Sequence, residues 1–188
     1  VKTMEITTIG ELLHWSYANL AMAHAALTAK STKYGRTHFM IRAKLYAGLN
    51  KETMNLAPLA DDERLKMILP QACCYCGSDQ FLSVDHLIPT KQGGKNCGEN
   101  LVWACRSCNS AKGARDMIEW LATKKQFPSL LLLRRYLKIV ILLCREKNLM
   151  HAAIENAPPL AFSLLAIPRQ FPPLAQLTLW VIPLEASE

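Results

Sequence analysis

Apolar residues recur at helical spacing over most of the chain, and only its middle has the character of strands. Residues 11–30 are rich in Ala and Leu and contain neither Pro nor Gly, which predicts a long helix. Residues 36–49 predict a second helix with one basic side. Residues 61–69 predict a short third helix, which Asp61 can cap and Pro70 ends.

Two short strands are expected in the centre of the chain. Residues 81–89, which end at a Pro, and residues 100–104 each have the composition of a strand. A Gly-rich loop at 92–96 lies between them, and a helix at 106–112 follows, with Gly113 as its C-cap. The centre therefore predicts a strand, a loop, a strand and a helix.

The rest of the chain is expected to be helical or irregular. Residues 116–125 predict a helix, and residues 130–147 predict a long amphipathic helix with Ser129 as its N-cap. After this helix the apolar segments are interrupted by prolines and predict no regular element. The expected fold class is α+β, a mostly helical chain around a small central module.

Composition limits the class of protein. The 188 residues are 51% hydrophobic, which excludes disorder over the whole chain and suits one domain or a small domain with extensions. The formal net charge of +7 favours a polyanionic partner such as nucleic acid. Residues 30–50 hold five basic residues and no acid, and residues 106–147 hold ten basic residues against three acids. Two solvated helix faces would have the same pattern.

Cysteine usage and hydropathy indicate the compartment. Seven cysteines cannot all pair within the chain, and no charged segment followed by an apolar one opens the sequence. A reducing cytoplasm, with thiols free or bound to metal, is therefore expected. The most apolar stretch, 157–184, is interrupted by six prolines, so no membrane-spanning helix is predicted.

Four cysteines predict a structural zinc site. Cys73 and Cys76 form one C-x-x-C pair, and Cys105 and Cys108 form another after 28 intervening residues. Two such pairs supply the four thiolates of a tetrahedral Zn²⁺ site. A redox role is less consistent with two copies and no thioredoxin-like surroundings.

Three cysteines remain outside this expected set. The C-x-x-C spacing makes Cys73 a better ligand than its neighbour Cys74. Cys97 lies in a polar loop and is interpreted as a bystander. Cys144 lies on the apolar side of the long helix and is expected to be a small core residue.

The central segment resembles the HNH endonuclease family. The resemblance covers residues 73 to about 115, and several short motifs carry it as a set. These are Cys73-x-x-Cys76-Gly77, Asp85-His86-x-Ile88-Pro89, Gly93-Gly94, Asn100-Leu101-Val102 and Cys105-x-x-Cys108-Asn109-x-x-Lys112. The third family letter is often His and here is Asn109, a variant similar to the HNH domains of RNA-guided CRISPR nucleases. The resemblance implies a ββα-metal fold.

The resemblance also implies roles for individual residues. His86 would be the general base, since a histidine titrates near neutral pH. Asp85 and Asn109 would offer oxygen ligands to a catalytic Mg²⁺ or Mn²⁺, separate from the zinc. Asn100 resembles the family residue that bridges the loop and orients the base. Lys112 is placed to meet phosphate oxygens.

Further basic residues are candidates for DNA contact. Arg115 follows the module closely and is expected near the scissile phosphate. Arg36, Arg42 and Lys44 lie on the predicted basic helix and would bind the DNA backbone. The same helix could instead face water or a protein partner.

The chain is therefore predicted to be a metal-dependent DNA endonuclease. The expected division is a basic helical extension at 1–60, the nuclease module at 61–126, and an apolar extension at 127–188 that could dock a protein partner. Such extensions suit the effector of a phage-defence or restriction system. The alternative is a zinc-ribbon module that binds nucleic acid without cutting it. A zinc deaminase is excluded because H-x-E and P-C-x-x-C are missing.

Overall fold

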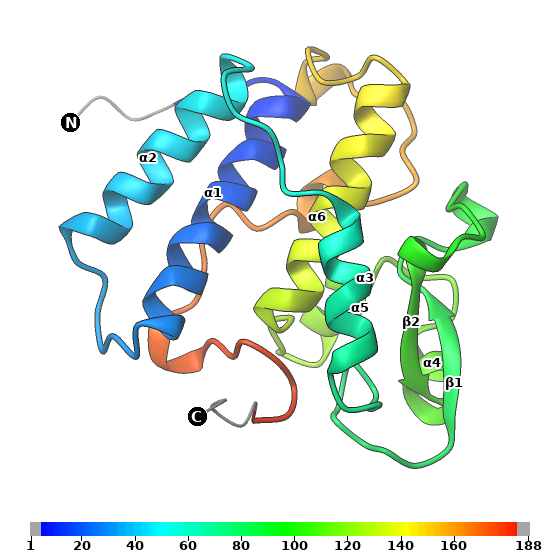
Figure 1. Cartoon of the computed structure of the whole chain (residues 1–188). Helices are drawn as coiled ribbons and strands as arrows, with labels where there is room; N and C mark the ends of the chain where they lie inside the picture. The colour runs from blue at the N-terminus through cyan, green and yellow to red at the C-terminus, as the bar shows by residue number, and fades with distance from the viewer. Residues whose placement is uncertain (1–4, 184–188) are drawn as a thin grey trace.

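Five long or medium helices make up the body of the molecule. The computed structural model describes residues 5–183 (Figure 1). The helices of the body are α1 (Ile9–Thr28), α2 (Arg36–Asn50), α3 (Leu59–Ile68), α5 (Met117–Thr123) and α6 (Leu130–Glu146). Each of them lies within two residues of a predicted helix at both ends. Helices α1, α5 and α6 bury most of their apolar residues, whereas α2 and α3 bury few of theirs.

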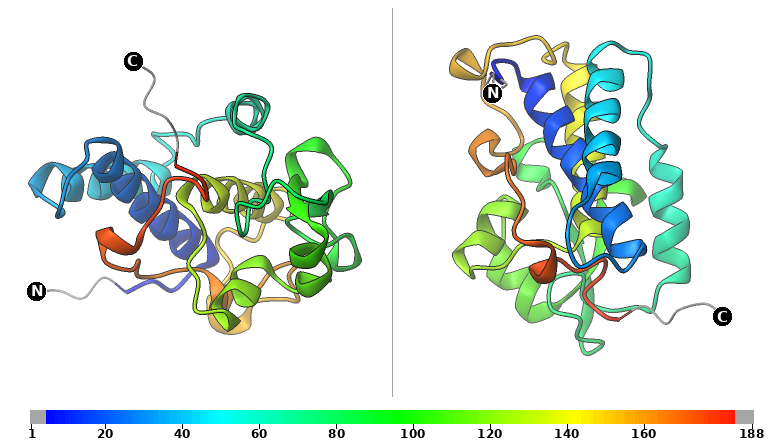
Figure 2. Two further views of the ribbon diagram at one scale, coloured as in Figure 1. Left: turned by 90° about the horizontal axis from the view of Figure 1, so that it is seen from below. Right: turned by 90° about the vertical axis from the view of Figure 1, so that its left-hand side faces the viewer.

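A two-stranded sheet and one short helix form a separate module at one end. Strands β1 (Leu82–His86) and β2 (Leu101–Cys105) are antiparallel, and α4 (Arg106–Lys112) follows β2 directly and packs on the sheet. Asp85 pairs with Val102 and His86 with Leu101 in this register. The expected α+β class with a ββα module is confirmed. Figure 2 shows this module at the opposite end of the molecule from α2.

One hydrophobic core runs through the body and reaches the module. Its fully buried members include Leu13 of α1, Trp120 of α5, Tyr136 of α6 and Ile88 just after β1. The packing is therefore continuous across residues 60 and 126, where the sequence predicts domain boundaries. The hydrophobic core has no gap at either boundary, and the predicted division into three parts stays a prediction.

An ionic network attaches α3 to α6. Asp62 is 3% exposed, and its carboxylate accepts from Lys138 Nζ at 2.5 Å and from Arg134 Nε at 2.8 Å. Arg135 pairs with Glu63 and also donates to the Glu99 carbonyl oxygen beside β2. Buried charges need such partners because they have lost water. These three basic residues of α6 therefore hold α3 in place, and Arg135 also links α6 to the loop before β2.

One predicted helix cap is wrong, and a second is right in position but makes no side-chain bond. Asp61 lies in the first turn of α3, and Pro58 is the N-cap, because the helix starts two residues earlier than expected. Ser129 stands at the N-cap of α6, but its hydroxyl makes no capping bond. The Thr178 and Leu179 carbonyl oxygens accept from the first two N–H groups of α6 instead. The C-terminal segment thus takes over the role of a side-chain cap.

The C-terminal segment wraps back over the helices. It forms 3₁₀ turns at Ile154–Asn156, Leu164–Ala166 and Leu174–Gln176. Its Phe162 and Ile167 are buried, and its Arg169 carbonyl oxygen accepts from Trp15 Nε1 of α1 at 2.9 Å. Much of the apolar surface predicted to dock a partner therefore packs on the chain itself. Within residues 5–183, no helix has the length and hydrophobicity to cross a membrane.

Replacing Asp62 with Asn should strongly destabilise the fold. The substitution leaves the buried cation of Lys138 and the partly buried cation of Arg134 without this counter-charge, which should lower the free energy of unfolding by about 3 kcal/mol. Asp61→Asn is the matched control, because its pair with Arg64 is exposed and 3.7 Å long, and it should cost less than about 0.5 kcal/mol. Urea unfolding of both variants measures the difference, and equal losses would contradict the argument.

Candidate active site

Four thiols converge behind the sheet. The sulfurs of Cys73, Cys76, Cys105 and Cys108 all lie within 4.8 Å of one another. Cys76 Sγ and Cys105 Sγ are 3.8 Å apart, close to the separation of about 3.8 Å that two thiolates have on a tetrahedral zinc with 2.3 Å bonds. The predicted set is therefore the one that the structure assembles, and it could hold zinc.

Backbone geometry positions these sulfurs. Gly77 has φ +78°, a value that a residue with a side chain rarely adopts, and its N–H donates to the Cys73 carbonyl oxygen at 2.8 Å. The Cys108 N–H donates to Cys105 Sγ, which lowers the pKa of the Cys105 thiol to about 7. A thiol that ionises more readily is a better metal ligand.

The remaining cysteines stay outside the cluster. Cys74 is buried beside it, and burial raises the pKa of its thiol well above the ordinary range. Cys144 is 1% exposed in the core, as predicted, and burial raises its pKa to about 11. Cys97 lies half-buried in the loop before β2.

Asp85 points from β1 toward α4 and is almost completely buried. Its Oδ2 accepts from the hydroxyl of Tyr75 at 2.5 Å. Both of its carboxylate oxygens lie 3.1 Å from Lys112 Nζ. Lys112 is 1% exposed, and its ammonium pairs with this carboxylate inside the module; the phosphate contact expected from the sequence stays a prediction. The resemblance alone gave no sign of Tyr75, which packs edge-to-face on Trp120.

Asn109 lies one turn before Lys112 on the same face of α4. Its amide nitrogen donates to Ser83 Oγ and to the Val84 carbonyl oxygen, both at 3.1 Å. Its Oδ1 accepts no hydrogen bond from the residues that the structure describes. Asp85 and Asn109 therefore both lie at the interface of β1 and α4, with a hard anionic oxygen and a neutral oxygen of the kind that Mg²⁺ binds.

His86 ends strand β1 and is only half-buried. Its Nε2 lies 2.9 Å from Oδ1 of Asn96 in the Gly-rich loop. An amide oxygen can only accept, so Nε2 carries the proton and Nδ1 has the free lone pair. Asn96 is thus the residue that holds the imidazole, and sequence reasoning did not single it out. Its only signal was its place in the loop after Gly93 and Gly94.

Asn100 fixes the loop and does not bond the His86 ring. Its side chain accepts from the Ile88 N–H and donates to the Ile88 and Lys95 carbonyl oxygens, at 2.8–2.9 Å. Gly94 fits against this clamp because a Cβ there would lie 1.9 Å from the Ile88 carbonyl oxygen. Asn100 therefore shapes the loop that contains Asn96, and its catalytic role stays a prediction.

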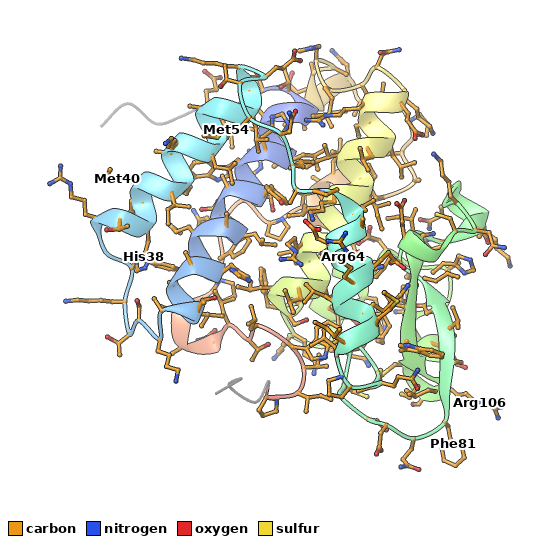
Figure 3. All side chains as sticks on the ribbon, viewed as in Figure 1. His38, Met40, Met54, Arg64, Phe81 and Arg106 are labelled. Atoms are coloured by element: carbon orange, nitrogen blue, oxygen red, sulfur yellow. The ribbon has the colours of Figure 1, made fainter. Side chains whose placement is uncertain are left out.

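The other predicted DNA contacts lie far apart. Arg115 bonds the Ala111 and Lys112 carbonyl oxygens at the end of α4. Arg42 stacks on the Trp15 ring, 4.6 Å from its centroid, and donates to Asn19. Arg36 and Lys44 are exposed on α2, which Figure 3 shows, through its labelled His38 and Met40, at the edge opposite Phe81 and Arg106 of the module.

Comparisons with known proteins agree with this geometry. Residues 73–115 match the family described as HNH endonuclease. A CRISPR-associated endonuclease Cas9 from Corynebacterium diphtheriae is 42% identical over 52 residues, which cover 26% of this chain and 5% of that protein. No solved structure matches the chain. The family match thus falls on the module, and this chain spans only a small part of the relative's length.

One zinc per chain should be needed for the module to fold. Cys105→Ser removes one of four converging ligands, and a structural zinc of this kind contributes on the order of 10 kcal/mol. Metal analysis should give one zinc for the parent, much less for Cys105→Ser, and an unchanged value for the control Cys97→Ser. A zinc-free parent with normal near-ultraviolet circular dichroism would contradict this prediction.

Proposed function

We propose that this chain, whose residues 73–115 are an HNH endonuclease module, is a metal-dependent endonuclease that hydrolyses phosphodiester bonds in DNA. One observation carries the proposal. The ββα module brings Asp85 and Asn109 to one β1–α4 interface and ends that same strand with His86, whose ring is held by Asn96. A pure binding module would not need all of these groups.

The histidine has the features of a general base. Its Nε2–H donates to Asn96, which leaves Nδ1 to take the proton of an attacking water. Asn100 keeps the surrounding loop in place through three hydrogen bonds. In this proposal these two asparagines divide the positioning of the base between them.

Asp85 and Asn109 would hold the catalytic Mg²⁺ or Mn²⁺. Such an ion would stabilise the negative charge that develops on the scissile phosphate and the leaving oxygen. The thiolate cluster is a different kind of site, because its soft ligands suit zinc and leave no oxygen donor. Its role is to hold the turn that contains Cys73 and Cys76, and with it Tyr75, against the sheet.

One observation favours the alternative of a binding module without cleavage. The Asp85 carboxylate, which a catalytic ion needs, is already neutralised by the buried ammonium of Lys112. An inactive module would keep such an ion pair permanently. Cleavage assays in the presence of Mg²⁺ or Mn²⁺ distinguish the two readings.

We further propose that the chain is the effector of a defence or restriction system. A relative that it matches is a CRISPR-associated endonuclease, and the body of this chain provides surface beyond the module. Genes encoding an ATPase, a methyltransferase or a sensor beside this one would support the proposal. The cytoplasmic location expected from the seven free cysteines stays a prediction.

Cleavage should depend on His86. His86→Ala removes the base and should lower the rate by about 10²- to 10⁴-fold, with DNA binding mostly retained. Asn96→Ala should cause a smaller loss, because the ring remains but is no longer held. His151→Ala is the control, since this histidine is exposed and lies outside the module. Plasmid cleavage with Mg²⁺ measures all three, and full activity in His86→Ala would refute the mechanism.

The exposed basic residues of α2 should strengthen DNA binding through phosphate contacts. Arg36→Gln with Lys44→Gln should reduce the slope of log K against log[salt] by about 0.9 for each lost contact. Cleavage at saturating DNA should be unchanged, because α2 lies far from the module (Figure 2). Arg169→Gln, an exposed control outside both basic regions, should not change the slope. An unchanged slope in the double variant would confine DNA binding to the module.

A further inference from the structure

The polar partners of the buried Lys112 ammonium are all oxygen atoms. Its Nζ lies 3.1 Å from both oxygens of Asp85, 3.0 Å from the His86 carbonyl oxygen and 3.5 Å from that of Gly113. The Lys112 side chain is fully buried and that of Asp85 is 6% exposed. An internal cation therefore fills the position beside the one carboxylate that the proposed function assigns to a divalent metal.

A divalent ion and this ammonium cannot share Asp85. Lys112 Nζ lies 3.1 Å from both carboxylate oxygens, so an ion bound to either oxygen would bring two like charges close together in a buried site, where they repel strongly. Tyr75 does not compete in this way, because its neutral hydroxyl binds Oδ2 without adding charge. Binding of a metal ion therefore requires Lys112 to leave, while Tyr75 can keep the carboxylate oriented.

We propose that Lys112 is an internal competitor for the catalytic cation, so that divalent metal binds Asp85 only by displacing the ammonium. This inference rests on the proposed metal-dependent nuclease function. It also reconciles the buried position of Lys112 with the phosphate contact expected from the sequence. Lys112 is the last residue of α4, and an ammonium displaced from Asp85 becomes available to an anionic phosphate.

Direct metal titration tests the competition without relying on activity. The zinc-loaded full chain is titrated with Mn²⁺, and free Mn²⁺ is followed by electron paramagnetic resonance. Lys112→Met keeps the aliphatic stem and removes the charge, so it should bind one Mn²⁺ per chain at least about 10-fold more tightly than the parent does. Unchanged or weaker binding in Lys112→Met would overturn the proposal.

A matched control is available elsewhere in the fold. Lys138 is also 1% exposed, pairs with Asp62 and donates to the Pro58 carbonyl oxygen, but it lies between α3 and α6. Lys138→Met should leave Mn²⁺ affinity unchanged. An equal gain in this control would assign the effect to lost positive charge in general and overturn the proposal.

Amine labelling of the unaltered chain keeps the test independent of variant folding. Acetylation by a water-soluble reagent, read by mass spectrometry, should find Lys112 protected without Mg²⁺ and more reactive with it, while Lys138 stays protected. Lys112 protection that Mg²⁺ does not change would refute the displacement.

Asp85→Asn separates the failure of this inference from the failure of the proposed function. If Asp85→Asn binds Mn²⁺ as the parent does, Asp85 is not a metal ligand and both fail. If Asp85→Asn loses the Mn²⁺ site but Lys112→Met gains no affinity, only the competition is wrong.

Discussion

The convergence of four cysteine thiols is the constraint on which the rest of the candidate site depends. Two thiols come from the Cys73–Cys76 turn before β1 and two from the junction of β2 and α4, so the cluster fixes that turn against the sheet. Tyr75 lies inside the turn, and its hydroxyl donates to the carboxylate of Asp85. The geometry of the proposed catalytic carboxylate is thereby linked to a site that suits zinc.

Burial of charge imposes a second constraint. Asp62 and Asp85 are both buried, and each is paired with a buried lysine. In a region of low dielectric an unpaired carboxylate would cost more than the fold could tolerate. Arg135 and Lys138 of α6 therefore pair with carboxylates inside the fold, and they are not part of the surface that DNA would meet. Exposed basic residues lie on α2 and on the module, at opposite ends of the molecule (Figure 2), and also at the ends of α5 and α6.

The helices of the body attach to the module through specific hydrogen bonds. α3 connects to α6 through Asp62 and to the loop before β2 through Lys66, whose Nζ donates to the Gly98 and Leu101 carbonyl oxygens. Asp116 caps α5 and also accepts from Tyr136 of α6 and from the Ser163 N–H. The module is thus attached on two sides, which limits how far its loops can move relative to the body.

The sequence by itself determined the local features of this protein. Local composition and apolar spacing predicted every long helix to within two residues, because these signals depend on residues close together in the chain. The two C-x-x-C motifs, though 28 residues apart, predicted the four converging thiols because a structural zinc takes four such ligands. Only the tertiary structure decided which polar and charged groups pair across elements. Three such pairings join segments that the packing of the whole fold brings together, which no local spacing encodes. They are the ion pair of Lys112 with Asp85, the hydrogen bond of Asn96 with His86, and the bonds from the carbonyl oxygens of residues 178–179 to the start of α6.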